Sequence, residues 1–343
     1  MPSVHEALDI ENPSALLDYL RQTGRIAPSE QPRIAILQGG VSNRTVWLAR
    51  ATGEAWVLKQ ALAKLRVNVD WFSSPERIHR EALGLHWLAC LAPQGSITPL
   101  IFEDREHHLL AMQAVAQPHA NWKTELLAGR IDPDHVRQFA RLLGTIHRES
   151  HGRADLAEVF GDRSFFESLR LEPYYGYSAQ QTPSAAPFLE SLRRETLARR
   201  LTLVHGDYSP KNILVYDGRL ILLDHEVIHF GDPAFDLGFS LTHFLSKAHH
   251  LPALRREFAS AALDYWRTYT EALGQPVWSA DLEARAVRHT LACLLARVVG
   301  RSPLEYLDPV ERARQREAVL CIMPAAPTSI ADLIFQFEEQ LCR

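Results

Sequence analysis

The sequence has few cysteines, and nothing in it points to an exported or disulfide-bonded protein. Cys90, Cys293, Cys321 and Cys342 are scattered over 343 residues and form no C-x-x-C pair. This spacing argues against a structural zinc knuckle and predicts reduced thiols, as in cytosolic proteins. No basic segment followed by an apolar stretch is visible near residue 1, so no secretory signal is recognised. We therefore expect a cytoplasmic protein.

Long hydrophobic runs and a strong excess of one charge are also missing. The most apolar window, residues 291–299, is far shorter than a membrane span and contains Arg297. The 37 Lys and Arg residues nearly balance the 41 Asp and Glu residues, which gives a formal net charge of −4. Such a balance argues against nucleic acid or an anionic membrane as the main partner.

The composition is that of a folded protein with one unusual excess. Hydrophobic residues make up 46% of the chain and charged residues 23%, which is enough to bury a core. A chain of 343 residues exceeds one core of usual size, so two domains are expected. The 16 histidines supply many potential metal ligands. Only their positions can decide whether they bind a metal.

The first 115 residues are rich in strand signals. Short runs of Val, Ile, Leu and Trp predict five strands, at residues 34–38, 45–50, 54–59, 97–102 and 108–112. A short helix opens at Asn12-Pro13, and Ser74 with Pro75 opens a long one that runs to about Cys90, between the third and fourth strands. We expect residues 1–115 to form an N-terminal nucleotide-binding lobe, a five-stranded antiparallel sheet with one long helix.

After Val115 the pattern becomes mainly helical. The exception is a predicted hairpin, in which Asp217-Gly218 joins strands at 213–216 and 220–223. The segment 172–187 contains three prolines and a Tyr-Tyr-Gly-Tyr cluster, so it is predicted to be a loop or lid. Residues 116–343 are therefore expected to form a helical C-terminal lobe with the catalytic loop and the substrate site. The fold class predicted for the whole chain is α+β.

The densest polar cluster runs from His205-Gly206-Asp207 to Asn212, and Asp224 follows twelve residues later. These residue types suit phosphoryl transfer. One carboxylate can accept the proton of an attacking hydroxyl, while the amide and the second carboxylate hold magnesium against the phosphates. The alternative is an ordinary polar turn, because Asp and Asn are common in turns.

A second pattern lies in the N-terminal lobe. Lys59 ends the third predicted strand, and Glu81 falls within the apolar stripe of the long helix, which comprises Ile78, Ala82, Leu85 and Leu88. A carboxylate on a buried face needs a partner. We expect this partner to be Lys59, because a Lys–Glu pair positions the ATP phosphates in kinases. The alternative is a peripheral Glu81 paired with a nearby arginine such as Arg77.

Together these residues resemble the catalytic core of the aminoglycoside phosphotransferase / choline kinase superfamily, small-molecule relatives of the protein kinases. The similarity rests on the H-G-D-x-x-x-x-N string at 205–212 and on the D-P-x-x-D-L string at 232–237, and it extends over roughly residues 30 to 300. It implies a bilobal protein-kinase-like fold that uses ATP and Mg²⁺ to phosphorylate a small-molecule hydroxyl. The acceptor stays open among amino sugars, sugars and amino alcohols.

The resemblance also implies a role for each matching residue. Asp207 is expected to be the catalytic base, Asn212 and Asp224 the metal ligands, and Lys59 with Glu81 the pair that clamps the phosphates. Glu226 completes a D-x-E string and is expected to approach the metal, while His205 and Asp236 support the loop. Backbone groups around the nucleotide are expected from Gly39, Gly40, Ser42 and Asn43 between the first two strands, and from Gln113 and Val115 in the hinge facing adenine.

Two other functions compete with this interpretation. His225-Glu226-Val227-Ile228-His229 matches H-E-x-x-H, the zinc motif of metallopeptidases, which requires a helix. The string continues a predicted strand, and Gly231 and Pro233 leave little room for that helix, so we expect magnesium rather than imidazole-bound zinc. The other candidate is a pseudokinase that binds nucleotide without transfer, which the presence of every expected kinase residue argues against. No D-F-G or A-P-E signature is present, which argues against a protein substrate.

Overall fold

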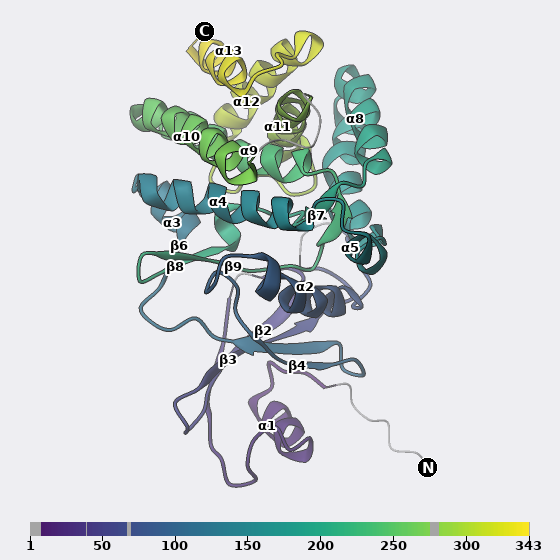
Figure 1. Ribbon diagram of the computed structural model, residues 1–343, viewed down its shortest axis with the longest axis vertical. Helices are drawn as coiled ribbons and strands as arrows, with labels where there is room; N and C mark the ends of the chain where they lie inside the picture. Colours follow the sequence, from purple (N-terminus) through teal and green to yellow (C-terminus); the bar gives the residue numbers. More distant parts are fainter. Residues whose placement is uncertain (1–7, 39, 67–69, 275–280, 343) are drawn as a thin grey trace. The chain divides into compact units, whose positions relative to one another are not determined.

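The computed structural model describes residues 8–38, 40–66, 70–274 and 281–342 (Figure 1). The internal contacts of the chain divide it into two compact units. The first comprises residues up to 90 together with 97–118, and the second comprises 91–96 together with the chain from 119 onward. Within the described residues, no helix combines the length and the apolar character needed to cross a membrane.

The first unit is built on a five-stranded antiparallel sheet with the order β1-β2-β3-β5-β4. Its strands are β1 (Arg33–Ile36), β2 (Asn43–Ala49), β3 (Ala55–Ala61), β4 (Leu100–Asp104) and β5 (Leu109–Gln113). The predicted sheet is therefore confirmed, with strand ends that differ from prediction by one to three residues.

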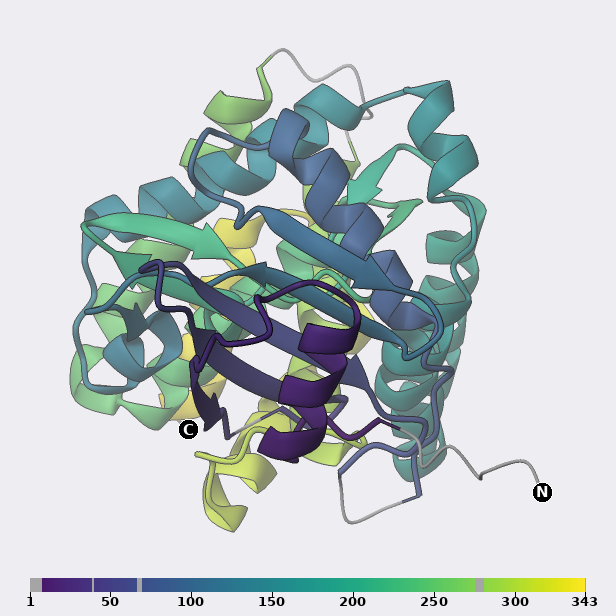
Figure 2. The same cartoon turned by 90° about the horizontal axis from the view of Figure 1, so that it is seen from below.

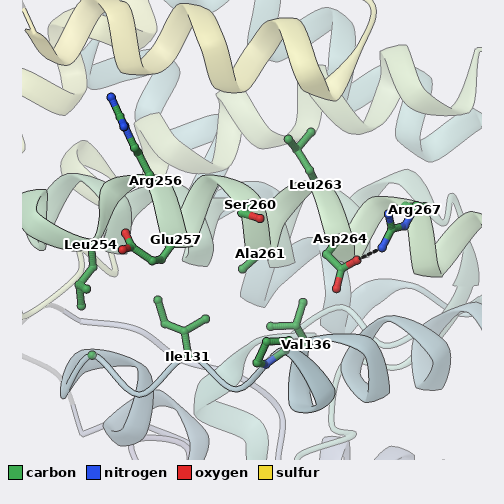
Figure 3. A pocket seen from close by; sticks show the side chains of 12 residues that line it. Ile131, Val136, Leu254, Arg256, Glu257, Ser260, Ala261, Leu263, Asp264 and Arg267 are labelled. Carbon is green, nitrogen blue, oxygen red and sulfur yellow. Dashed lines mark hydrogen bonds and ion pairs between the residues drawn. The ribbon is translucent and has the colours of Figure 1, made fainter.

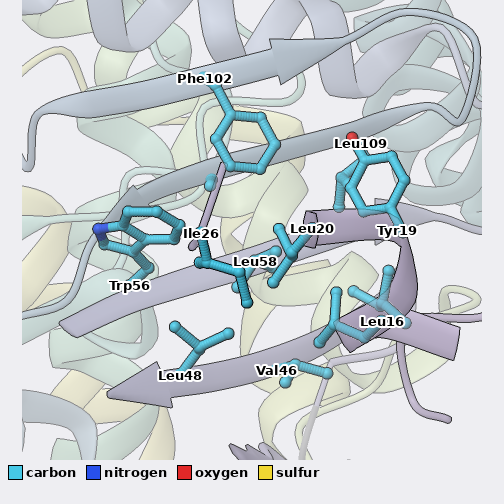
Figure 4. Close-up of a cluster of buried hydrophobic side chains, with 12 residues drawn as sticks. Leu16, Tyr19, Leu20, Ile26, Val46, Leu48, Trp56, Leu58, Phe102 and Leu109 are labelled. Atoms are coloured by element: carbon cyan, nitrogen blue, oxygen red, sulfur yellow. The ribbon is translucent and has the colours of Figure 1, made fainter. Parts of the chain in front are cut away.

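Each face of this sheet is covered by one helix. α1 (Pro13–Gln22) lies over the face that carries Trp56 and Leu58 of β3, and its Leu16 and Leu20 join their buried cluster (Figures 2 and 4). α2 (Arg77–Leu91) packs its apolar stripe on the opposite face. Because side chains alternate along a strand, Lys59 points to the face on which α2 packs.

The second unit is mainly helical. Its longer helices are α3 (Trp122–Leu127), α4 (Pro133–Ser150), α5 (Ala154–Val159), α8 (Ala186–Ala198), α9 (Ala234–His250), α10 (Arg255–Leu273), α11 (Leu282–Val299), α12 (Pro309–Ile322) and α13 (Ile330–Cys342). α4 begins at a proline preceded by a capping aspartate, since Asp132 accepts a hydrogen bond from the Asp134 backbone N–H at 2.8 Å. α9 is buried almost along its whole length and forms the centre of this unit.

Short strands hold the polar loop of the second unit. β7 (Thr202–Val204) pairs with β10 (His229–Gly231), and β8 (Ile213–Tyr216) pairs with β6 (Ala120–Asn121) and β9 (Arg219–Leu222). The predicted hairpin is therefore present, and its turn residues Asp217 and Gly218 both have positive φ. Residues 205–212 lie between β7 and β8, so both ends of the polar loop are tied to strands.

The prediction of a loop or lid at residues 172–187 is wrong. This segment is helical, made of the π-helix η1 (Glu167–Gly176), α7 (Tyr177–Gln181) and the short 3₁₀ turn η2 (Pro183–Ala185). Pro173 lies inside η1, whose wide turn differs from the α-helix that proline normally breaks. Tyr174 and Tyr175 are buried, so tertiary packing outweighs the local helix-breaking signals.

Candidate active site

In the first unit, Lys59 and Glu81 form a close ion pair. Lys59 Nζ lies 2.6 Å from Glu81 Oε1, and the Glu81 side chain is fully buried. Arg77, the other partner considered for Glu81, donates to backbone carbonyl oxygens, including that of Leu62 at 2.9 Å. The pair joins β3 to α2, which fixes the position of the lysine on the sheet.

The turn before β2 contains the residues expected to cover the phosphates. Gly39 lies outside the described residues. A Cβ added at Gly40 would come no closer than 3.5 Å to another atom, so that position is not sterically tight. Ser42 and Asn43 are buried, and the Asn43 amide donates to Ser42 Oγ at 3.2 Å. A turn of this kind binds phosphate through hydrogen bonds that its backbone N–H groups donate.

The segment expected to face adenine follows β5. Gln113 donates its backbone N–H to Pro99 O at 2.9 Å, and Ala114 donates to Ala55 O at 2.9 Å. These two donors are engaged within the unit. The next backbone donor along the chain is that of Val115, which is half-buried.

In the second unit, the polar loop fixes Asp207 through one of its two carboxylate oxygens. Asp207 Oδ2 accepts from Asn212 Nδ2 at 2.7 Å and lies 2.9 Å from Arg170 Nη2. Asn212 Nδ2 also donates to the Asp207 backbone oxygen at 3.0 Å. Because both side-chain contacts use Oδ2, Oδ1 is left to accept a proton, as far as the described residues show.

Arg170 is a site residue that the sequence did not reveal. It lies in η1, donates from Nε to Gly206 O at 2.9 Å, and is 8% exposed. Burial opposes its charge, but the neighbouring Asp207 carboxylate favours it, and the pKa of Arg170 is raised overall. No local motif marks this arginine, because it reaches the loop only through the tertiary fold.

Asp236, from the D-P-x-x-D-L string, holds the start of the loop through hydrogen bonds to its backbone. Its carboxylate accepts the backbone N–H of His205 at 2.7 Å and that of Gly206 at 2.8 Å, and it lies 3.4 Å from His147 Nε2. Burial works to raise the pKa of Asp236, but the hydrogen bond and charge of His147 outweigh it and lower the pKa. The His205 ring accepts the Asp207 backbone N–H at 3.2 Å, and burial lowers its pKa, as suits a neutral acceptor.

Gly206 is the position in this loop where only glycine fits. Its φ is +78°, and a Cβ there would meet Val227 Cγ2 at 2.9 Å. The absent side chain lets both backbone N–H groups, of 205 and 206, reach Asp236.

Asn212, Asp224 and Glu226 offer oxygen ligands on neighbouring segments. Asn212 O accepts the Leu223 backbone N–H at 2.9 Å, so Asp224 directly follows the residue that is hydrogen-bonded to Asn212. Carboxylate oxygens of Asp224 and Glu226 lie within 4.8 Å of each other. Two carboxylates and an amide oxygen form a hard donor set, which fits Mg²⁺.

The comparison with known proteins identifies the family. The sequence profile of the phosphotransferase enzyme family matches residues 33–301, which is most of the chain. The chain belongs to this family. It is a small-molecule phosphotransferase, and the resemblance seen in the sequence is confirmed.

Relatives of this phosphotransferase include sugar kinases. A methylthioribose kinase from Citrobacter koseri is 25% identical over 344 residues, covering 84% of this chain and 85% of the relative. Another, from Pectobacterium carotovorum subsp. carotovorum, is 24% identical over 277 residues, covering 72% and 68%.

Solved structures of similar shape are also kinases of small molecules. The ethanolamine kinase of Plasmodium vivax has a TM-score of 0.55 at 12% identity and covers 98% of this chain and 90% of its own. A macrolide 2′-phosphotransferase from Brachybacterium faecium has a TM-score of 0.53 at 19% identity, covering 92% and 99%. At these identities the likeness shows the fold alone, and it confirms the predicted protein-kinase-like fold class.

The H-E-x-x-H string of this phosphotransferase does not form a helix. Residues 225–228 make a turn, and His229 begins β10. His229 stacks on Phe166 with ring centroids 3.9 Å apart, and its Nδ1 lies 3.0 Å from Val227 O. The zinc-peptidase motif needs both imidazoles on one helical face, and this segment does not provide it.

A separate groove of about 780 Å³ lies between α10 and the start of α4 (Figure 3). Ile131 and Val136 form one side of it, and the opposite side carries Arg256, Asp264 and Arg267 from α10. Asp264 and Arg267 are paired with each other. None of the residues predicted for phosphoryl transfer lines this groove.

Proposed function

We propose that this protein transfers the γ-phosphoryl group of ATP to a hydroxyl group of a small molecule, with Asp207 as the catalytic base. The observation that carries the proposal is the orientation of Asp207, whose Oδ2 is held by Asn212 and Arg170. Oδ1 would accept the proton of the attacking hydroxyl as the bond to phosphorus forms. A cytoplasmic location belongs to the same proposal, since ATP is abundant there.

Asn212, Asp224 and Glu226 would hold magnesium, which when bound neutralises charge on the phosphates. Lys59 would contact the phosphates and Glu81 would hold Lys59 in place. The turn at Gly39, Gly40, Ser42 and Asn43 and the hinge at Gln113 and Val115 would contact the nucleotide through backbone groups. We accordingly propose residues 1–115 as the nucleotide-binding lobe and 116–343 as the lobe that binds the acceptor.

Of the three acceptor classes that the sequence leaves open, we propose a sugar. The support is that the Citrobacter koseri and Pectobacterium relatives are methylthioribose kinases. The pseudokinase remains the second candidate, and only an assay with an acceptor separates the two.

The test is ADP release from MgATP with a panel of pentoses, methylthioribose, aminoglycosides and amino alcohols. We expect a sugar to raise ADP release far above the rate without acceptor, and Asp207→Asn to abolish that increase while MgATP still binds. If Asp207→Asn keeps more than a few per cent of the turnover, Asp207 is not the base. If MgATP binds but no compound on the panel stimulates ADP release, the result favours the pseudokinase.

A further inference from the structure

We propose that the first unit carries a zinc site formed by His79, His108 and Glu76, separate from the residues proposed for phosphoryl transfer. His79 Nε2 lies 3.2 Å from His108 Nδ1, and His108 Nδ1 lies 3.6 Å from Glu76 Oε1. The three potential ligand atoms all lie within 4.8 Å of one another. Two imidazoles and a carboxylate suit zinc, whereas magnesium prefers an all-oxygen set.

Two of the three separations between the ligand atoms are close to those of a tetrahedral site. Zinc binds imidazole nitrogen and carboxylate oxygen at about 2.0–2.2 Å, so two ligand atoms of a tetrahedron lie about 3.4 Å apart. The nitrogen–nitrogen and nitrogen–oxygen distances above lie on either side of that value. An ion could therefore bind with small side-chain shifts, and water would fill the fourth position.

A carboxylate behind His79 completes the arrangement expected of a metal-binding histidine. His79 Nδ1 lies 2.5 Å from Glu103 Oε1 of β4. This contact keeps a proton on Nδ1 and presents the lone pair of Nε2 to the ion. The His79 side chain is 6% exposed, whereas that of Glu76 is 57% exposed, so the site is anchored inside and reached from solvent.

The backbone at His108 supports the same interpretation. Its φ is +47°, a left-handed conformation that few residues other than glycine adopt, although Asn, Asp and His do so more often than most. Such conformations concentrate at functional positions. His108 immediately precedes β5, whereas Glu76 immediately precedes α2 and His79 lies in the first turn of α2. Zinc would therefore clamp the first turn of α2 to the β4–β5 turn.

The experiment titrates Zn²⁺ into the chelator-stripped full chain, with calorimetry and elemental analysis as readouts. We expect the wild type to bind one more zinc ion per chain than His108→Asn, which keeps a residue that tolerates positive φ. Glu103→Gln, behind His79, should weaken that site by about 10- to 100-fold. Glu76→Gln, which removes a direct ligand at an exposed position, should weaken it at least as much. Cobalt bound to the wild type should show the intense visible bands of tetrahedral coordination.

The matched control is His107→Asn, beside the site, whose ring faces Asp104 at 3.2 Å instead. This variant should bind zinc like the wild type, and zinc should raise the melting temperature of both but not that of His108→Asn. Equal zinc binding by wild type and His108→Asn would overturn the proposal, and so would equal losses in His107→Asn and His108→Asn. If His108→Asn fails to fold, unchanged zinc affinity in Glu76→Gln overturns it. None of these readouts depends on phosphoryl transfer.

Discussion

The contacts of single residues explain how much of the site the sequence could predict. Lys59 and Glu81 were predictable as a pair, because strand alternation and the helical stripe place both on buried faces that pack together. Arg170 was not predictable, because η1 and the 205–212 loop are distant in sequence and meet only in the folded unit. Local periodicity carries no information about such a contact.

The Lys59–Glu81 pair leads to a prediction about stability and ATP binding. Lys59→Met removes one partner of a buried ion pair, which should lower the free energy of unfolding by about 3–5 kcal/mol. Lys59→Met/Glu81→Met replaces both charges by apolar side chains and should recover most of that stability. Urea denaturation and the KM for MgATP measure the two effects. The double variant should remain poor in ATP binding; normal binding would contradict the role proposed for Lys59.

Arg170 is predicted to act as a positioning residue for Asp207. Arg170→Met should lower kcat by about 100-fold, because a small misplacement of a reacting group has an effect of this size. The KM for MgATP should change little, since Arg170 orients the base, and Arg170→Lys should restore part of kcat. Steady-state kinetics on both variants tests this.

The matched control for Arg170 is Arg163→Met. Arg163 also donates to backbone carbonyls, at 2.7 Å to Leu197 O, but the described structure gives it no contact with Asp207. Its loss should leave kcat within a few-fold of wild type. Equal falls in kcat for Arg163→Met and Arg170→Met would show that Arg170 contributes only to folding.

At the scale of helices and strands, the sequence predicted the regular elements of the first unit but missed the π-helix of the second. The five strands and α2 follow from short runs of strand-forming residues and from a helical stripe with clear end signals, and each lies close to its predicted place. η1 was missed because its breakers, Pro173 and Gly176, are locally strong. The wide turn of η1 accommodates Pro173 and Gly176, and the burial of Tyr174 and Tyr175 stabilises the helix. That burial depends on the tertiary fold.

The packing of α9 on α11 leads to a second stability prediction. A Cβ added at Gly238 would lie 2.4 Å from His289 Cβ and 2.7 Å from the Thr290 backbone nitrogen. Gly238→Ala should therefore separate the two helices and lower the free energy of unfolding by about 1–3 kcal/mol, despite the better helix propensity of alanine. Ser260→Ala, at an exposed position of α10, is the control and should change it by less than about 0.5 kcal/mol. Equal melting temperatures for wild type and Gly238→Ala would contradict the prediction.

At the scale of the whole molecule, buried histidines make the stability depend on pH. Burial and neighbouring cations hold the pKa of His243 and of His289 well below 6.5. The unfolded chain therefore binds more protons than the folded chain below pH 6.5, so stability falls as the pH is lowered. Each histidine contributes up to about 1.4 kcal/mol per pH unit in this range.

We therefore expect a lower melting temperature at pH 5.5 than at pH 7.5. His289→Gln should reduce this difference, because one of the buried histidines with a strongly lowered pKa can no longer take up a proton on unfolding. Differential scanning calorimetry at the two pH values measures it. A melting temperature that rises on acidification, or an unchanged difference in His289→Gln, would contradict this assignment.

Short patterns in the sequence were enough to predict the family, the sheet and the polar loop: runs of strand-forming residues, a helical stripe, and the spacing of Asp207, Asn212 and Asp224. Only the tertiary structure showed that Arg170 holds Asp207, and that His79 and His108 lie 3.2 Å apart although 29 residues separate them. Composition alone could not explain the excess of histidines. The contact between His79 and His108 supplies a specific hypothesis for two of them, a zinc site. Contacts between segments distant along the chain are decided by which faces pack together, and that depends on the whole unit.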